Sequence, residues 1–301
     1  MTLPLVKLDS WVLDILVDPL DKSRLRKMEG YDDVWLSEYG RVYRAIDGVR
    51  DLRVLQTDTT QSARIWRKGQ AAYETWSAEM AVNDDYDTYI REIEGVREVY
   101  EALPITGVCL DVGGHQGRVR YFLDDNVRYI SCDPYLNVLA HLDAQPNLLK
   151  AYPCLNEPCN FVCAQAEYLP FAAQSFDTLH MRSVLDHFAS PEQALLETYR
   201  VLKADGFLVL GTAVRFGKRG TPSAMVLAKE FASHVLQALR IRRSADFHTW
   251  KPTYRMVVDL IQRCGFSIEQ EHWQEGTNNR VIYLRARKMS PFPRLETEPA
   301  S

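Results

Sequence analysis

Apolar positions in this chain form short runs that alternate with amphipathic stretches, and the alternation is most regular over residues 105–288. Short apolar runs favour buried strands, whereas apolar residues spaced three or four apart favour helices. The pattern predicts strands at residues 107–111, 128–132, 160–163, 177–181, 206–212, 266–271 and 280–287. It predicts helices at residues 117–124, 135–143, 192–203 and 253–264. This alternation is typical of an α/β fold, a seven-stranded, mainly parallel sheet covered by helices on both faces.

The remaining segments have different patterns. Residues 1–57 are predicted to form a small β-rich N-terminal module, and residues 58–104 a helical connector with charges between its apolar anchors. Residues 214–252 interrupt the strand–helix alternation and contain an amphipathic helical stretch, which predicts an inserted lid. The last segment, residues 289–301, is polar and proline-rich and is predicted to be a disordered tail.

Composition narrows the class of protein. With 46% hydrophobic and 25% charged residues, the chain of 301 residues is ordinary for a globular protein. The formal net charge of −4 gives no overall attraction to nucleic acid. No apolar run is long enough to span a membrane, and the N-terminus lacks the basic-then-apolar order of a signal peptide. The six cysteines contain no CxxC pair, so we expect a reducing, cytoplasmic location and no metal site.

The segment VCLDVGGHQG at residues 108–117 carries the clearest chemical signal. An apolar strand ends beside Asp111, and the chain then turns through Gly113, Gly114 and Gly117. Glycine permits positive φ angles and lets a ligand approach the backbone closely. The N–H groups at the start of the following helix would face that ligand. Alone, this segment predicts a nucleotide-type crevice.

The ends of the next predicted strands carry polar residues. In an open parallel sheet, ligands bind beyond the carboxyl ends of the strands. Asp133 ends the second strand, where a carboxylate can accept both hydroxyls of a ribose. Gln165 and Ala166 follow the third strand, where a side-chain amide and a backbone N–H could meet an adenine edge. Asp186 and His187 follow the fourth strand, near the expected reacting centre.

Together these motifs resemble the class I S-adenosylmethionine-dependent methyltransferases, in particular the branch that includes ubiquinone and menaquinone biosynthesis enzymes. The similarity covers about residues 108–211 and includes AEYLPFAAQSFD at residues 166–177 and YRVLKADG at residues 199–206. It implies a Rossmann-like fold and S-adenosyl-L-methionine as cofactor.

The resemblance also implies residue roles. Asp111, Gly113 and Gly117 would shape the pocket for the methionine end of the cofactor, and Asp133 would hold the ribose. Gln165 and Ala166 would face adenine, and His187 would lie near the transferred methyl group. We hypothesise that His187 accepts the acceptor's proton, with Asp186 as its orienting partner or as a second base. The alternative is that His187 only packs at the start of its helix.

Two positions depart from the family pattern. His115 occupies the middle glycine position of the loop, with Gly114 one residue earlier. Its side chain could narrow the pocket or donate a hydrogen bond to the methionine carboxylate. Gln165 occupies a position that often holds aspartate. These departures leave open a degenerate domain without catalytic activity.

The N-terminal module resembles the zinc-ribbon-like methyltransferase-activator family at residues 13–22 and 34–52. The positions of that family's cysteines hold Asp18, Asp21, Leu36 and Tyr39. Leucine and tyrosine are not ligands of structural zinc, so no structural zinc is expected. We interpret the segment as a degenerate module that packs on the larger domain.

The insert at residues 214–252 contains eight basic and two acidic residues. This surplus suggests an anionic acceptor, although a solvated basic face would give the same pattern. His248 and Trp250 are predicted to border the acceptor pocket. The predicted function is methyl transfer to O or N of a small-molecule, glycan or lipid-linked acceptor. The alternatives are an RNA methyltransferase, which the net charge disfavours, and a non-catalytic scaffold.

Overall fold

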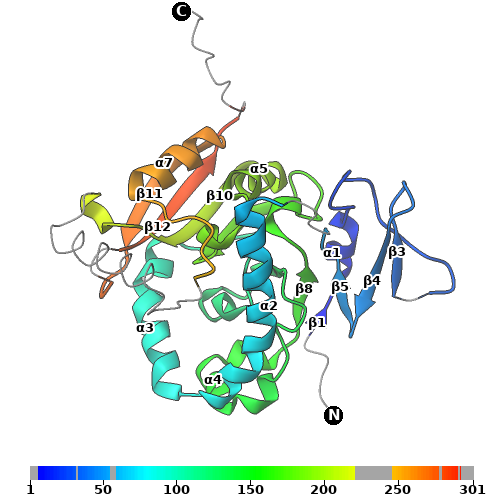
Figure 1. Ribbon diagram of the computed structural model, residues 1–301, viewed down its shortest axis with the longest axis horizontal. Coiled ribbons are helices and arrows are strands. Elements are labelled where there is room, and N and C mark those ends of the chain that lie inside the picture. Colours follow the sequence, from blue (N-terminus) through cyan, green and yellow to red (C-terminus); the bar gives the residue numbers. More distant parts are fainter. Residues whose placement is uncertain are drawn as a thin grey trace, which may run out of the picture.

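The computed structural model describes residues 6–31, 33–54, 59–220, 246–277, 280–290 and 292. One mixed sheet forms the centre of the molecule (Figure 1). Its main strands are β6 (Val108–Val112), β7 (Arg128–Asp133), β8 (Cys159–Cys163), β9 (Phe176–Arg182), β10 (Leu202–Ala213), β11 (Phe266–Trp273) and β12 (Val281–Lys288). All seven predicted strands are present, and the predicted Rossmann-like α/β class is confirmed.

The strand order is β11-β12-β10-β9-β6-β7-β8, continued by the N-terminal strands. Strands β10, β9, β6, β7 and β8 pair in parallel, whereas β12 is antiparallel to both β10 and β11. From β6 the chain runs to β7 and β8 on one side and then crosses to β9 on the other. Ligand crevices form at such a reversal of strand order, here at the carboxyl end of β6.

The N-terminal segment extends this sheet. Its strands are β1 (Val6–Lys7), β2 (Arg26–Lys27), β3 (Val34–Leu36), β4 (Val42–Ile46) and β5 (Val49–Asp51). Strands β2 to β5 form an antiparallel meander, and β5 pairs in parallel with β8. Strand β1 pairs with the first residues of β8, Cys159 and Asn160, whereas β5 pairs with the last two, Val162 and Cys163. Two N-terminal segments therefore share this edge of β8.

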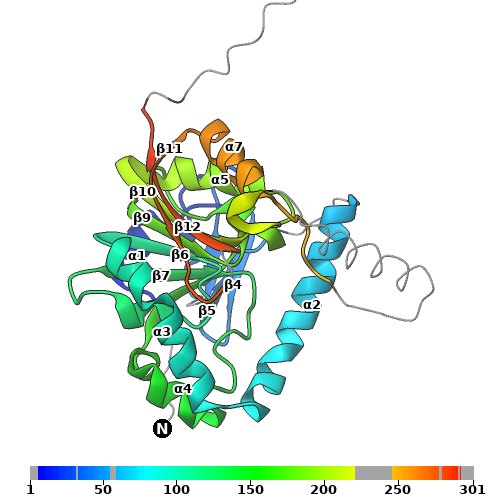
Figure 2. The same ribbon diagram turned by 90° about the vertical axis from the view of Figure 1, so that its left-hand side faces the viewer.

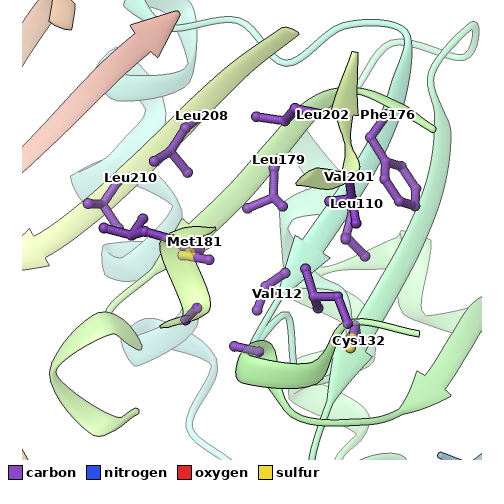
Figure 3. Close-up of a cluster of buried hydrophobic side chains, with 14 of the residues drawn as sticks. Leu110, Val112, Cys132, Phe176, Leu179, Met181, Val201, Leu202, Leu208 and Leu210 are labelled. Atoms are coloured by element: carbon purple, nitrogen blue, oxygen red, sulfur yellow. The ribbon is translucent and has the colours of Figure 1, made fainter. Parts of the chain in front are cut away.

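Helices cover both faces of the sheet (Figures 1 and 2). They are α1 (Ser10–Ile15), α2 (Gln61–Val82), α3 (Tyr86–Ala102), α4 (Pro146–Ala151), α5 (Pro191–Val201) and α7 (Tyr254–Arg263). Because neighbouring strand residues point to opposite faces, Leu110 and Cys109 belong to different buried clusters. Leu110 packs in the cluster that includes residues of α1, α5 and α7 and is drawn in part in Figure 3. Cys109 packs in the cluster that includes residues of α3.

Helices α5 and α7 begin where the sequence predicts, with Ser190 and Thr253 accepting capping hydrogen bonds. Two other helix predictions were wrong. Residues 117–124 contain only a short 3₁₀ helix, η1 (Arg118–Phe122). Residues 135–143 form turns that lead into the 3₁₀ helix η2 (Leu142–Ala144). His141 has a left-handed φ of 61°, which a right-handed helix does not contain.

Parts of the expected insert and tail lie outside the described residues, namely residues 221–245, 291 and 293–301. At the start of the expected tail, the Met289 N–H donates to the Gly265 carbonyl, and the ring of Phe292 packs against Tyr199. Among the residues that the structure describes, no helix is long and apolar enough to cross a membrane.

Candidate functional site

A pocket of about 450 Å³ lies at the carboxyl ends of β6, β7 and β9, where the strand order predicts a crevice. Helix α2 stands beside this edge (Figure 2) and contributes an aromatic wall. The sheet contributes polar groups and the glycine loop. The residues that line the pocket include Trp66, Tyr73, Trp76, Glu92, Tyr100, Asp111, Gly113, Gly114, His115, Arg118, Asp133, Tyr135, His180, Arg182 and His187.

The glycines of the loop are needed for different reasons. Gly113 and Gly117 have φ angles of 69° and 79°, which non-glycine residues rarely adopt. Gly114 has an ordinary φ, but a Cβ atom there would collide with the carboxylate of Asp111. His115 has a φ of 47° and therefore carries backbone strain in the position where the family has glycine.

A buried hydrogen-bond network supports the floor of the pocket. Asp111 Oδ1 lies 2.7 Å from His180 Nδ1, and the hydroxyl of Tyr129 donates to Asp111 Oδ2 over 2.6 Å. The hydroxyl of Tyr100 lies 3.1 Å from His180 Nε2. Burial raises the pKa of both tyrosines well above the usual value, so both hydroxyls keep their protons. With both carboxylate oxygens bonded, Asp111 acts as a brace beneath the glycine loop.

Asp133 lies where the sequence places it, at the end of β7 in the pocket wall. Its side-chain oxygens accept the N–H groups of His115 and Tyr135, each over 3.0 Å. Burial raises the pKa of this carboxyl to about 7, although both hydrogen bonds oppose that shift. Each carboxylate oxygen has a second lone pair, so the group could still accept hydroxyls from a ligand.

His115 lines the same pocket. Its carbonyl accepts a hydrogen bond from Ser131 over 3.2 Å, and its ring lies edge-on to Tyr135 with 6.4 Å between ring centroids. Burial lowers the pKa of His115 to about 4, so the imidazole is neutral near pH 7. It can therefore offer one donor and one acceptor to a ligand, but no charge.

Three charged residues that the sequence analysis did not single out form another wall. Glu92 of α3 bridges Arg118 and Arg182, with N–O distances of 2.9 and 3.2 Å. Two guanidinium groups share one carboxylate, so this wall carries a net positive charge. No local motif marks these residues, because they come from α3, the glycine loop and β9.

At the carboxyl end of β8 the structure differs from the expected adenine contact. The Gln165 amide pairs with Val54, whose N–H donates to Oε1 over 2.7 Å and whose carbonyl accepts from Nε2 over 2.8 Å. The side chain therefore holds the N-terminal segment, while one lone pair of Oε1 and one hydrogen of Nε2 lie outside this pair. Ala166 begins a 3₁₀ turn, η4 (Ala166–Tyr168), and is buried.

Asp186 and His187 lie in η5 (Leu185–His187), directly after β9. His187 lines the pocket, and burial lowers its pKa. Asp186 faces His248, with 3.6 Å between Oδ2 and Nε2, and the rings of His187 and His248 lie 4.5 Å apart. The Trp250 N–H donates to the Asp186 carbonyl, so His248 and Trp250 lie against this turn, but neither is among the residues that line the pocket.

Part of this chain is similar in sequence to known methyltransferases. Residues 110–210 match the family described as "Methyltransferase domain". A curated relative, an uncharacterised chloroplastic methyltransferase of Arabidopsis thaliana, is 27% identical over 127 residues, which are 42% of this chain and 31% of the relative. The match thus spans about a third of that relative's length.

Two solved structures are similar to this chain. The 1,6-didemethyltoxoflavin-N1-methyltransferase of Burkholderia thailandensis, with bound 1,6-didemethyltoxoflavin and S-adenosylhomocysteine, is 14% identical; the match covers 88% of this chain and 99% of that one, with a TM-score of 0.51. A complex of the Haloferax volcanii Trm112 methyltransferase activator with a methyltransferase matches over 72% of this chain and 97% of that one. It is 13% identical, with a TM-score of 0.46.

Proposed function

We propose that this chain, which carries a class I S-adenosylmethionine-dependent methyltransferase domain at residues 110–210, transfers a methyl group to a small-molecule acceptor. The match of residues 110–210 to a methyltransferase domain supports the predicted enzyme class, and S-adenosyl-L-methionine is the cofactor that this class implies. One observation carries the proposal: the pocket unites the glycine loop with the buried carboxyl of Asp133 at the reversal of strand order.

The proposed cofactor site follows from this pocket. Asp133 accepts the ribose hydroxyls, and the loop from Gly113 to Gly117, braced by Asp111, surrounds the methionine end. Gly114 allows close approach, and His115 contacts the cofactor with a neutral ring. The positive wall formed by Arg118 and Arg182 fits the methionine carboxylate. Gln165 and Ala166 mark the adenine end, where the Gln165 amide positions Val54.

The acceptor side is mainly aromatic. Trp66, Tyr73 and Trp76 of α2 and Tyr135 after β7 line the pocket. Flat rings favour an acceptor that has a planar or apolar face. The same pocket of about 450 Å³ must hold the cofactor as well as the acceptor, which leaves room for a small acceptor. We therefore favour a small molecule over a glycan or a lipid-linked acceptor.

The rate of methyl transfer depends mainly on how the acceptor is aligned with the methyl group of the cofactor. The sulfonium makes the methyl group electrophilic, so holding the acceptor in line with the S–CH₃ bond provides most of the rate. An acceptor hydroxyl must also lose its proton. His187 is neutral and lines the pocket, so it can accept that proton, with Asp186 beside it in the same turn.

Calorimetry with S-adenosylmethionine and S-adenosylhomocysteine tests the proposal. We expect both ligands to bind with one site per chain and to bind more weakly to Asp133→Asn. A screen of small aromatic acceptors, glycans and lipid-linked acceptors with methyl-labelled cofactor then identifies the acceptor class. If the wild-type chain binds neither ligand, the proposal fails and the scaffold hypothesis is favoured.

For the N-terminal module we propose a degenerate form of the methyltransferase-activator fold. Asp18 is fully buried and accepts hydrogen bonds from the Leu20 N–H at 2.7 Å, Arg41 Nε at 2.8 Å and the Tyr43 hydroxyl at 3.1 Å. Arg41 also pairs with Asp21. Two of the four positions that correspond to the activator family's cysteines are thus joined by a guanidinium group, which supports a module held together without zinc.

A further inference from the structure

We propose that Asp186, His187 and His248 form a binding site for a divalent transition-metal ion in the wall of the acceptor pocket. One potential ligand atom from each residue lies within 4.8 Å of the other two. The cysteine spacing predicted no metal site, and His248 is far from Asp186 and His187 along the chain. Only the fold brings the three side chains together.

Two of these residues carry buried polar atoms without a partner among the described residues. Asp186 is 8% exposed, and its Oδ1 atom accepts no hydrogen bond. His187 Nδ1 is buried and has no partner either. Such atoms are rare in folded proteins because each one costs free energy when it leaves water unpaired. A cation bound by these side chains would supply a partner that the described residues lack.

His248 is oriented as a metal ligand. Its Nδ1 atom lies 2.7 Å from Asp246 Oδ1, and Lys251 holds the same carboxylate. A carboxylate accepts a hydrogen bond from Nδ1–H, so the lone pair of the ring lies on Nε2. Nε2 is the atom that faces Asp186. A carboxylate behind a ligating histidine is the usual outer partner in metal sites.

Hydrogen bonds hold the two segments in fixed relative positions. The N–H groups of Thr249 and Trp250 donate to the Asp186 carbonyl over 2.8 and 3.2 Å. The Thr249 hydroxyl donates to the Phe188 carbonyl over 2.5 Å. The ligands therefore need little rearrangement to close on an ion.

The ligand set selects the kind of ion. Two imidazoles and one carboxylate suit Zn²⁺ and related divalent transition metals rather than Mg²⁺ or Ca²⁺. A direct ion pair explains the cluster less well. The 3.6 Å between Asp186 Oδ2 and His248 Nε2 exceeds a normal hydrogen bond and leaves Asp186 Oδ1 and His187 Nδ1 unsatisfied.

Three protein ligands would leave a coordination position open, and of the three residues His187 lines the pocket. The consequence for catalysis rests on the proposed function. An acceptor hydroxyl bound to the ion would release its proton to solvent more readily. Its oxygen would then bond to the methyl carbon as the S–CH₃ bond breaks, which leaves S-adenosylhomocysteine. In this loaded state the ion, and not His187, activates the acceptor.

Metal titration of the full chain tests the site. After treatment with a chelator, Co²⁺ is added while its visible absorption is recorded, and Zn²⁺ is then titrated in competition with a chromophoric chelator. We expect one ion per chain in the wild type. Asp246→Asn should weaken binding about 10- to 100-fold, as expected for loss of an outer partner. His248→Ala, which removes a ligand, should weaken it further.

His272→Ala is the matched control, since it removes a half-buried histidine on β11, remote in sequence from the cluster. This variant should bind the ion like the wild type. Circular dichroism verifies that all variants fold, and the side chain of His248 is 46% exposed, so its removal is compatible with folding. The proposal is overturned if the wild type binds no ion, or if His248→Ala binds it as tightly as the wild type.

Calorimetry with S-adenosylhomocysteine separates this inference from the proposed function. If the stripped chain binds S-adenosylhomocysteine but no ion, only the metal site is refuted. If the chain binds the ion but no S-adenosylhomocysteine, the methyltransferase proposal fails while the metal site stands.

Discussion

The buried carboxyl of Asp133 makes cofactor binding dependent on pH in a way that can be calculated. Its pKa in the empty pocket is about 7, chiefly because burial disfavours the charged form. Below that pH the group is mostly protonated. If the ribose hydroxyls donate to the carboxylate, binding must then expel a proton. Affinity should therefore fall as the pH drops below 7.

The expected size follows from the titration. At pH 6 a group with a pKa of about 7 is ionised in about one molecule in 11, so S-adenosylhomocysteine should bind about 11-fold more weakly than at high pH, a loss of about 1.4 kcal/mol. At pH 8 the loss should be about 1.1-fold. Calorimetry at pH 6, 7 and 8, in two buffers of different ionisation enthalpy, measures both the affinity and the released proton.

Asp133→Asn is the control, because asparagine has nearly the same shape and does not titrate. The variant should bind S-adenosylhomocysteine more weakly than the wild type at pH 8. Its affinity should not change between pH 6 and 8 through ionisation of residue 133. A raised pKa also means that the free protein loses stability as the pH rises from about 4 to about 7. A wild-type affinity that stays constant from pH 6 to 8 would refute this reasoning.

Three other substitutions test the site. Gly114→Ala should weaken S-adenosylhomocysteine binding at least about tenfold in calorimetry, because the new Cβ would collide with the Asp111 carboxylate and displace the loop. Gln165→Ala should lower the free energy of unfolding in urea by about 2 kcal/mol, because the backbone groups of Val54 lose their partners. Its effect on S-adenosylhomocysteine affinity should stay within about threefold; a larger loss would mean that the amide contacts adenine. His180→Ala should lower the unfolding free energy by about 2–4 kcal/mol, because Asp111 loses a buried partner, and an unchanged urea midpoint would contradict that role.

The sequence alone determined the sheet and part of the site. Apolar runs identified the seven main strands, and Ser190 before Pro191 marked the start of α5. The glycine loop and Asp133 were also predictable, because a loop and a strand end are encoded by adjacent residues. The same logic failed at residues 135–143, where amphipathic spacing predicted a helix but the chain forms turns, with a left-handed φ of 61° at His141.

Tertiary structure alone decided which distant side chains meet. His180 is a histidine inside an apolar strand, a pattern typical of a core residue, and only pairing of β9 with β6 brings it to Asp111. Likewise, Gln165 meets Val54, and Asp186 meets His248, only after the chain has folded. Hydrophobic periodicity records which face of an element is buried. Contacts between remote elements depend on strand register and on how helices and loops dock, and no local pattern encodes them.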